Sequence, residues 1–281
     1  MSRSPTVTVA DRYLMGASTS ELDRMLFQGE LFRPEAERLL ERCGPGPGAR
    51  ALDVGCGPLG IVDLLAGRVG ADGEVVGLDV QEEMVERARL EAAERGLGNV
   101  RLVHGDAARS GEQPATFDFV HTRLVLMNVP HCDAVLKEMI ALARPGGIVA
   151  VQDVDWVTRL CDPPHPAWER LVEVITELWR LNGMDVHLGR RLPRLLRDAG
   201  LVDVRVDASA RVFQPDHPYQ TLLVERAELC RDALVDRGLI TSGELDRCVA
   251  ELRSHLAEPG TVVVHPLLFQ AWGRRPEDTA A

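Results

Sequence analysis

Short apolar runs alternate with amphipathic stretches through the first half of the chain. Runs rich in Leu, Val, Ile and Ala, closed by Gly, Asp or Thr, have the character of buried strands. They predict strands over residues 50–55, 74–80, 100–106, 117–122 and 147–153. Between them apolar residues recur every three or four positions, which predicts helices over about 59–68, 81–95 and 133–143. Because strands alternate with helices, we expect an α/β fold with a doubly wound, Rossmann-like, mostly parallel sheet.

Two helices are expected before the first strand. The sequence Ser18-Thr-Ser-Glu21 is a capping-box pattern that begins the first helix, and Pro34 separates it from the second. A segment rich in Gly and Pro, residues 43–49, leads into the main domain. We therefore predict an N-terminal helical segment over residues 1–48, which acts as a lid or packs on a second copy in a homodimer.

The second half of the chain departs from the alternating pattern. It predicts helices over 166–181, 188–199, about 217–236 and 242–257, and strands over 202–212 and 261–271. Most of these helices interrupt the sheet pattern. We therefore predict a helical cap, formed by insertions at about 160–186 and 214–259 in a main domain of residues 49–281.

Charge and cysteine content narrow the range of partners. The chain of 281 residues has a formal net charge of −11, and an acidic surface repels nucleic acid. Six scattered cysteines without a CxxC pair predict neither a zinc site nor a disulfide framework. No long apolar run resembles a signal peptide or a membrane span. We expect a cytoplasmic protein that binds no metal and acts on a small molecule.

A glycine-rich loop joins the first expected strand to its helix. It reads Asp53-Val-Gly55-Cys56-Gly57-Pro-Leu-Gly60. Glycines permit a tight turn and the close approach of a ligand. Asp79 ends the second strand, 19 residues beyond Gly60, where an acid can hold a ribose diol. Taken alone, this spacing also fits the dinucleotide fingerprint of an NAD-dependent oxidoreductase.

Three further features favour S-adenosylmethionine (SAM). The charge of Asp53 would be repelled by a pyrophosphate but attracted by the ammonium group of SAM, which carries no phosphate. Asp106 ends the third strand, where a carboxylate can accept a hydrogen bond from an adenine amino group. The sequence Arg144-Pro-Gly-Gly147 precedes the fifth strand.

In this order, the segments LDVGCGPLG, GLDV, HGDA, FDFVHTRLVLMNVP and ARPGG resemble the class I SAM-dependent methyltransferases over roughly residues 50–153. The region from Tyr13 to Gln28 resembles a subgroup near the ubiquinone and menaquinone methyltransferases. The resemblance implies methyl transfer from SAM to a small molecule. Pro58 replaces the Ala or Ser that is frequent in the family, but proline is well tolerated at a first helical position.

The resemblance also implies a cofactor site, spread over the loop, the strand ends and the N-terminal segment. At the methionine end of the cofactor, the implied residues are Asp53, Gly55, Cys56, Gly57 and Arg123. Asp79 would hold the ribose, and the adenine would lie against Val80, Met84, Gly105, Asp106 and Ala107. Three residues of the N-terminal segment would cover the cofactor: Tyr13, Met15 and Gln28.

Catalysis needs a base only when the methyl acceptor is protonated. Their positions after strands four and five favour His131 and Asp153 as catalytic residues. Further candidates are His121 of strand four and His165, His187 and His265 of the cap. No NPPY-like motif follows strand four, which argues against an exocyclic amine such as that of adenine.

The acceptor itself is less well defined by the sequence. An apolar face of the cap favours a hydrophobic metabolite, such as a quinone or a secondary metabolite. An NAD-dependent oxidoreductase and a SAM-binding protein without turnover are the alternatives. The residues leave O-, N- and C-methylation open.

Overall fold

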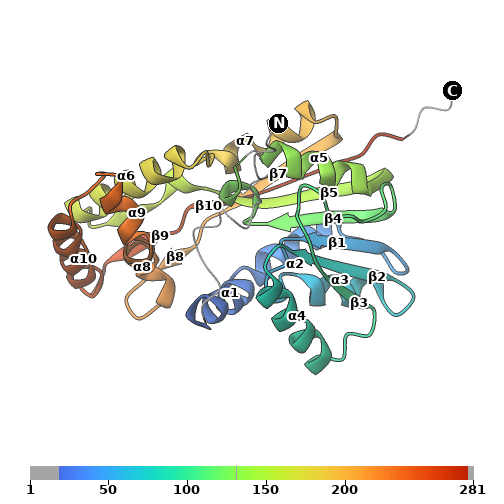
Figure 1. Ribbon diagram of the computed structural model, residues 1–281, viewed down its shortest axis with the longest axis horizontal. Coiled ribbons are helices and arrows are strands. Elements are labelled where there is room, and N and C mark those ends of the chain that lie inside the picture. The colour runs from blue at the N-terminus through green and yellow to red at the C-terminus, as the bar shows by residue number, and fades with distance from the viewer. Residues whose placement is uncertain (1–18, 131, 278–281) are drawn as a thin grey trace, which may run out of the picture. The chain divides into compact units, whose positions relative to one another are not determined.

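The computed structural model describes residues 19–130 and 132–277 (Figure 1). The chain divides into two compact units. Within the described residues, the first unit comprises the chain up to Asp153, Arg191–Asp207 and the chain from Gln270 onward. The second unit comprises Val154–Arg190 and Ala208–Phe269.

Parallel strands form the frame of the first unit. The central strand β1 (Arg50–Val54) pairs with β2 (Glu74–Asp79) on one side and with β4 (Phe117–Arg123) on the other. Next to these lie β3 (Val100–His104), parallel to β2, and β5 (Ala143–Asp155), parallel to β4.

The full sheet has the order β3-β2-β1-β4-β5-β10-β7, where β7 is Val202–Ser209 and β10 is Leu267–Arg274. From β1 the chain winds outward through β2 and β3, and then returns to the other side of β1 with β4. This confirms the doubly wound α/β fold. In such sheets ligands bind beyond the carboxyl ends of the strands where the winding reverses, which here means β1 and β4.

The helices of the first unit bury the aliphatic surface of this sheet. α3 (Val62–Val69) packs on β1 and β2, α4 (Glu82–Glu94) on β2 and β3, and α5 (Cys132–Leu142) on β4. Before β1, α1 (Thr19–Leu31) and α2 (Arg33–Cys43) form the two predicted helices, and Pro34 lies in the first turn of α2. Buried side chains from α2, β1, α3, β2 and α4 form one core, including Leu39, Ala51, Leu65, Val75 and Val85.

The second unit contains a group of helices and a small antiparallel sheet. α6 (Pro166–Leu181), α8 (Leu222–Leu229), α9 (Arg231–Asp236) and α10 (Ser242–Leu256) pack together. The sheet has the order β6-β9-β8, with β6 at Leu160–Asp162, β9 at Val262–Val264 and β8 at Val212–Phe213. Among the described residues, none of the helices has the length and apolar character needed to cross a membrane.

Several predicted elements differ from the structure. The predicted strand 202–212 ends at Ser209 as β7, and its last residue, Val212, begins β8. The last predicted strand is split into β9 and β10, because Pro266 lies between them and has no N–H for a strand ladder. The predicted helix 217–236 is split at Cys230 into α8 and α9, which nothing in the local sequence marks. β5 begins at Ala143 rather than at residue 147, with a register shift in its pairing with β4. α7 (Leu188–Asp198) agrees with its prediction.

Candidate functional site

The glycine-rich loop lies between β1 and α3, at the carboxyl end of the central strand. Gly55, Gly57 and Gly60 all adopt the left-handed region, with φ of 71°, 55° and 57°. A Cβ at Gly55 would lie 2.3 Å from Val125 Cγ2, and one at Gly60 would lie 2.3 Å from Asp53 Oδ2. Backbone conformation and close packing therefore both require glycine here.

Replacing Gly60 with alanine is expected to destabilise the first unit beyond the effect of backbone strain. A left-handed alanine costs about 1–2 kcal/mol, and the added methyl would also lie 2.8 Å from the carbonyl oxygen of Cys56. Gly96, in the turn that ends α4, is a matched control, because its φ is 67° and a Cβ there meets nothing within 4 Å. Chemical denaturation should give a lower free energy of unfolding for Gly60→Ala than for Gly96→Ala; equal values would contradict the packing argument.

Beneath the loop, Asp53 is held by two groups of the protein. Its Oδ1 lies 2.7 Å from Nδ1 of His121, and its Oδ2 accepts from the backbone N–H of Ile61 at 3.0 Å. The other ring nitrogen of His121 lies 3.1 Å from Oε1 of Gln152. Asp53 is 2% exposed, and His121 and Gln152 are fully buried. Asp53 thus fixes the start of α3 and forms a buried chain across β1, β4 and β5.

Asp79 ties the loop to the second strand. Its Oδ2 accepts from the Gly57 N–H at 2.8 Å and its Oδ1 from the Gln81 N–H at 2.9 Å. Burial raises the pKa of the Asp79 carboxyl, although these backbone hydrogen bonds act to lower it. Each carboxylate oxygen has a second lone pair, so a ligand hydroxyl can still donate to it.

The other residues predicted to contact the cofactor, in the loop and on the adenine side, differ in how deeply their side chains are buried. The Cys56 thiol is buried against the position where a Cβ of Gly77 would lie, so only its backbone faces the loop. Met84 is 1% exposed and belongs to the core side of α4. Val80 is half-buried.

The turn after β3 contains the last three predicted adenine contacts. Gly105 donates its N–H to the carbonyl oxygen of Asp79 at 2.9 Å, which joins this turn to the end of β2. Asp106 Oδ1 accepts from the Ala108 N–H at 2.8 Å, and Ala107 is buried. The carboxylate of Asp106 therefore stabilises its own turn, and its free lone pairs remain available to a ligand.

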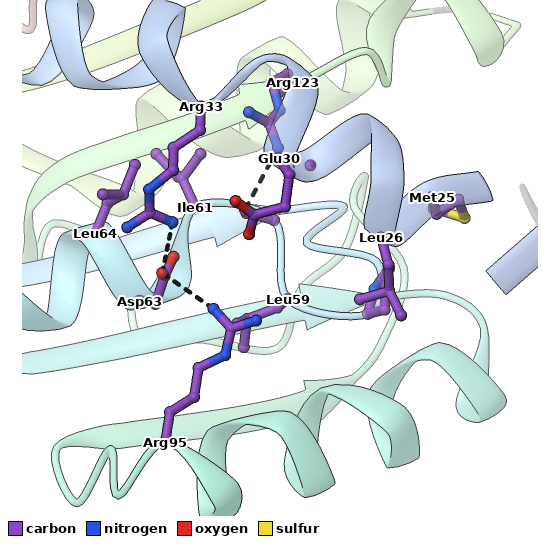
Figure 2. A pocket seen from close by; sticks show the side chains of 13 residues that line it. Met25, Leu26, Glu30, Arg33, Leu59, Ile61, Asp63, Leu64, Arg95 and Arg123 are labelled. Carbon is purple, nitrogen blue, oxygen red and sulfur yellow. Dashed lines mark hydrogen bonds and ion pairs between the residues drawn. The ribbon is translucent and has the colours of Figure 1, made fainter. Parts of the chain in front are cut away.

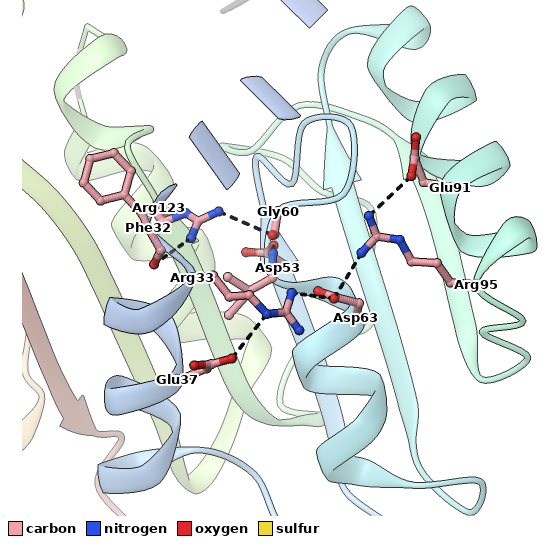
Figure 3. Close-up of polar contacts among 10 residues, drawn as sticks. Phe32, Arg33, Glu37, Asp53, Gly60, Asp63, Glu91, Arg95 and Arg123 are labelled. Carbon is pink, nitrogen blue, oxygen red and sulfur yellow. Dashed lines mark hydrogen bonds and ion pairs between the residues drawn. The ribbon is translucent and has the colours of Figure 1, made fainter. Parts of the chain in front are cut away.

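Arg123, at the end of β4, links the loop to the N-terminal helices (Figure 3). Its guanidinium donates to the carbonyl oxygens of Gly60 at 3.3 Å and Phe32 at 3.5 Å. Nearby, Asp63 forms ion pairs with Arg33 of α2 at 2.7 Å and with Arg95 at 3.2 Å. These contacts join α2, the loop and the end of α4.

Side chains of α1 lie against the same loop. Figure 2 shows Met25, Leu26 and Glu30 of α1 around a cavity that Leu59 and Ile61 also line. A Cβ at Gly57 would lie 2.8 Å from Met25 Cε. The cavity has a volume of about 20 Å³, which is room for about one water molecule and not for a nucleoside. Gln28, also on α1, is half-buried.

The predicted catalytic residues are placed as follows. His131, like Tyr13 and Met15 of the predicted cofactor site, lies outside the described residues. Asp153 is fully buried, and its Oδ2 accepts from the backbone N–H of Met127 at 3.0 Å. No group of three His, Cys, Asp or Glu side chains suited to a metal ion occurs in the described part of the chain.

Sequence analysis treated His121 as a further catalytic candidate of strand four and missed its contact with Asp53. The signal is visible once the register is known, because Asp53 and His121 are direct partners in the parallel pairing of β1 with β4.

Comparison with known proteins gives consistent matches. The profile of a family described as methyltransferase domain matches residues 45–200. Nocamycin O-methyltransferase of Saccharothrix syringae is 42% identical over 122 residues, which are 43% of this chain and 44% of that protein. A demethylmenaquinone methyltransferase of Geobacillus sp. (strain WCH70) is 34% identical over 182 residues, 60% of this chain and 78% of that protein.

A solved structure supports the fold. Phosphoethanolamine N-methyltransferase 2 of Haemonchus contortus, in complex with phosphomonomethylethanolamine and S-adenosylhomocysteine, matches with a TM-score of 0.55 and 17% identity. The match covers 87% of this chain and 53% of that chain, and at this identity it shows the fold alone. The chain therefore spans about half the length of this structure and less than half that of the nocamycin enzyme.

Proposed function

Because the chain belongs to the family of class I SAM-dependent methyltransferases, we propose that it transfers a methyl group from SAM to a small, hydrophobic metabolite. One observation carries the proposal. The loop between β1 and α3 has three left-handed glycines, and the N–H of Gly57 is bonded to Asp79 at the end of the neighbouring strand. Backbone and carboxylate thus meet where the winding of the sheet reverses.

The residues of the first unit fit a nucleoside that carries an amino acid. The left-handed turn of the three glycines places the loop backbone beyond the carboxyl end of β1, where the methionine portion of the ligand would bind. Asp79 retains lone pairs for the two hydroxyls of a ribose, and Asp106 retains them for an adenine amino group. Asp53 contributes negative charge beneath the loop, although both its oxygens already have protein partners. The residue assignments Gly55, Cys56, Val80, Met84, Gly105, Ala107 and Arg123 are part of this proposal.

SAM supplies a methyl group already activated by its sulfonium. The main task of the chain is therefore to orient the two reactants and to exclude water. We propose His131 as the residue that removes a proton from the acceptor when one must leave. Asp153, buried beneath Met127, has the geometry of a positioning residue, and a proton-transfer role for it stays a prediction.

The similarity to nocamycin and demethylmenaquinone methyltransferases supports a secondary metabolite or a quinone-type molecule as the acceptor. A cytoplasmic location and a homodimer also stay predictions.

We further propose that α1 acts as a lid. Met25 of α1 covers Gly57, since a Cβ there would lie 2.8 Å from Met25 Cε, so a ligand that contacts the backbone of Gly57 requires that α1 shift or that Met25 adopt another rotamer. Gln28, Tyr13 and Met15 would then cover the bound cofactor.

Isothermal titration with SAM and with NADH tests the proposal. We expect saturable binding of SAM in the micromolar range that is typical of enzyme ligands, of order 1–100 μM, and none of NADH. Binding of NADH without SAM would support the oxidoreductase alternative. Incubation with radiolabelled SAM and a panel of quinols, phenols and organic acids should then label an acceptor. Tight SAM binding with no label on any acceptor would support a binding protein without turnover.

A further inference from the structure

The second unit contains a buried arginine without a carboxylate partner. Arg159 directly follows the short 3-10 helix Trp156–Thr158 and is 9% exposed. Its Nε donates to the carbonyl oxygen of Trp156 at 3.2 Å, and its guanidinium carbon lies 3.2 Å from the centroid of the Trp156 ring. Within residues 19–130 and 132–277, no Asp or Glu forms an ion pair with it.

Other arginines of this unit show the opposite arrangement. Their side chains are between 32% and 50% exposed, and each has a carboxylate partner; the pairs are Arg170–Glu244, Arg190–Asp155, Arg231–Asp246 and Arg253–Glu228. A surface ion pair contributes little, whereas a buried charge without a counter-ion costs several kcal/mol. Arg159 therefore lacks a carboxylate partner at a buried position, where an unpaired charge costs more free energy than at the surface.

The surroundings of Arg159 add positive potential. Burial and the charge of Arg226 lower the pKa of the Arg159 guanidinium. Burial, together with Arg159, Arg211 and Arg226, lowers the pKa of His265 to about 3, so this imidazole is neutral at pH 7. Its Nδ1 lies 2.9 Å from the carbonyl oxygen of Pro266, a contact in which the ring nitrogen donates. The cations of this region are thus arginines, and His265 is too weak a base to accept a proton at neutral pH.

Arg159 lines a small cavity with a mixed wall. Trp168, Tyr219 and His265 supply aromatic groups, and Leu223 and Val263 supply aliphatic ones. Its volume of about 10 Å³ is close to the space of one water-sized group. An oxygen of a charged group fits beside the guanidinium, while the rest of a ligand would need the aromatic and aliphatic wall to open.

We propose that Arg159 is the binding partner of the carboxylate of a small hydrophobic organic acid. The proposal stands on the second unit alone. A planar guanidinium matches the two oxygens of a carboxylate. A phosphate dianion would need more donors than this mostly apolar cavity supplies.

Titration of the full chain with 1-naphthoate and with the neutral, nearly isosteric 1-naphthamide tests the site. We expect the wild-type protein to bind naphthoate at least about ten-fold more tightly, the ratio expected for one charge-assisted contact of about 1.4 kcal/mol. The preference should vanish in Arg159→Leu and persist in Arg231→Gln, whose arginine is exposed and ion-paired. Equal binding of acid and amide by the wild type, or stronger binding of 1-naphthyl phosphate than of naphthoate, would overturn the proposal.

Thermal unfolding of the same variants separates a binding role from a structural one. A buried charge awaiting a ligand destabilises the free protein, so Arg159→Leu should unfold at the same temperature as the wild type or higher. A clear drop in its unfolding temperature would mean that Arg159 stabilises the fold and would count against the proposal. SAM binding, measured on the wild type, tests the proposed function separately: naphthoate binding without SAM binding would keep the anion site and remove the methyltransferase.

Discussion

Asp79→Ala is expected to weaken SAM binding by at least about 100-fold. The carboxylate accepts from the Gly57 N–H at 2.8 Å and from the Gln81 N–H at 2.9 Å, and in the proposed function also from the ribose hydroxyls. Hydrogen bonds to a charged group contribute about 1.5–3 kcal/mol each, so losing two corresponds to a factor of at least 100. Isothermal titration measures the effect directly.

Asp72 provides the control, because it is exposed in the turn just before β2. Asp72→Ala should bind SAM like the wild type. If Asp79→Ala stayed within about three-fold of the wild type, a ratio worth less than 1 kcal/mol, the ribose assignment would fail. Burial raises the pKa of the Asp79 carboxyl above the ordinary 3.8. Affinity for SAM should therefore begin to fall on acidification at a higher pH than an exposed aspartate would give.

Asp53→Ala is expected to cost the largest amount of folding stability, about 3–5 kcal/mol. The change removes one partner of a buried pair and leaves the His121 ring, which is fully buried, facing an empty space. The N–H of Ile61 also loses its acceptor at the start of α3. Urea or thermal unfolding gives the free-energy difference, and a double-mutant cycle with His121→Ala gives the part that belongs to the pair.

Asp133→Ala is the matched control on an exposed helix face. Asp133 lies 3.8 Å from Lys137, and both side chains are mostly exposed, so its loss should cost about 0.5 kcal/mol or less. A cost below about 1 kcal/mol for Asp53→Ala, or additive effects of Asp53→Ala and His121→Ala, would show that the buried pair does not stabilise the unit.

The sequence predicted the part of the site that depends on local backbone. Gly55, Gly57 and Gly60 were expected to form a tight turn, and all three adopt positive φ. Which side chains face the loop was not predictable in the same way. Cys56 lies between two of these glycines, yet its thiol is directed into the core. The direction of a side chain in a left-handed turn depends on how the turn packs on β2.

Residues at strand ends were harder to interpret. Asp153 was expected to lie at the carboxyl end of the fifth strand, but β5 continues to Asp155, so Asp153 is fully buried within it. Strand length depends on pairing with the neighbouring strand, which the sequence pattern does not contain. The break between β9 and β10 could have been found locally, since Pro266 cannot donate to a strand ladder.

By itself, the amino-acid sequence determined the order of strands and helices from β1 to β5, the place of the glycine-rich loop and the acid at the end of β2. These features follow from periodicity and from the conformational freedom of glycine, which act over a few neighbouring residues. Only the tertiary structure placed His121 against Asp53, although 68 residues separate them, and left Arg159 buried without a carboxylate. Such contacts depend on strand register and on packing between segments that are distant in the sequence. The depth of burial then sets the free-energy cost of each charged side chain.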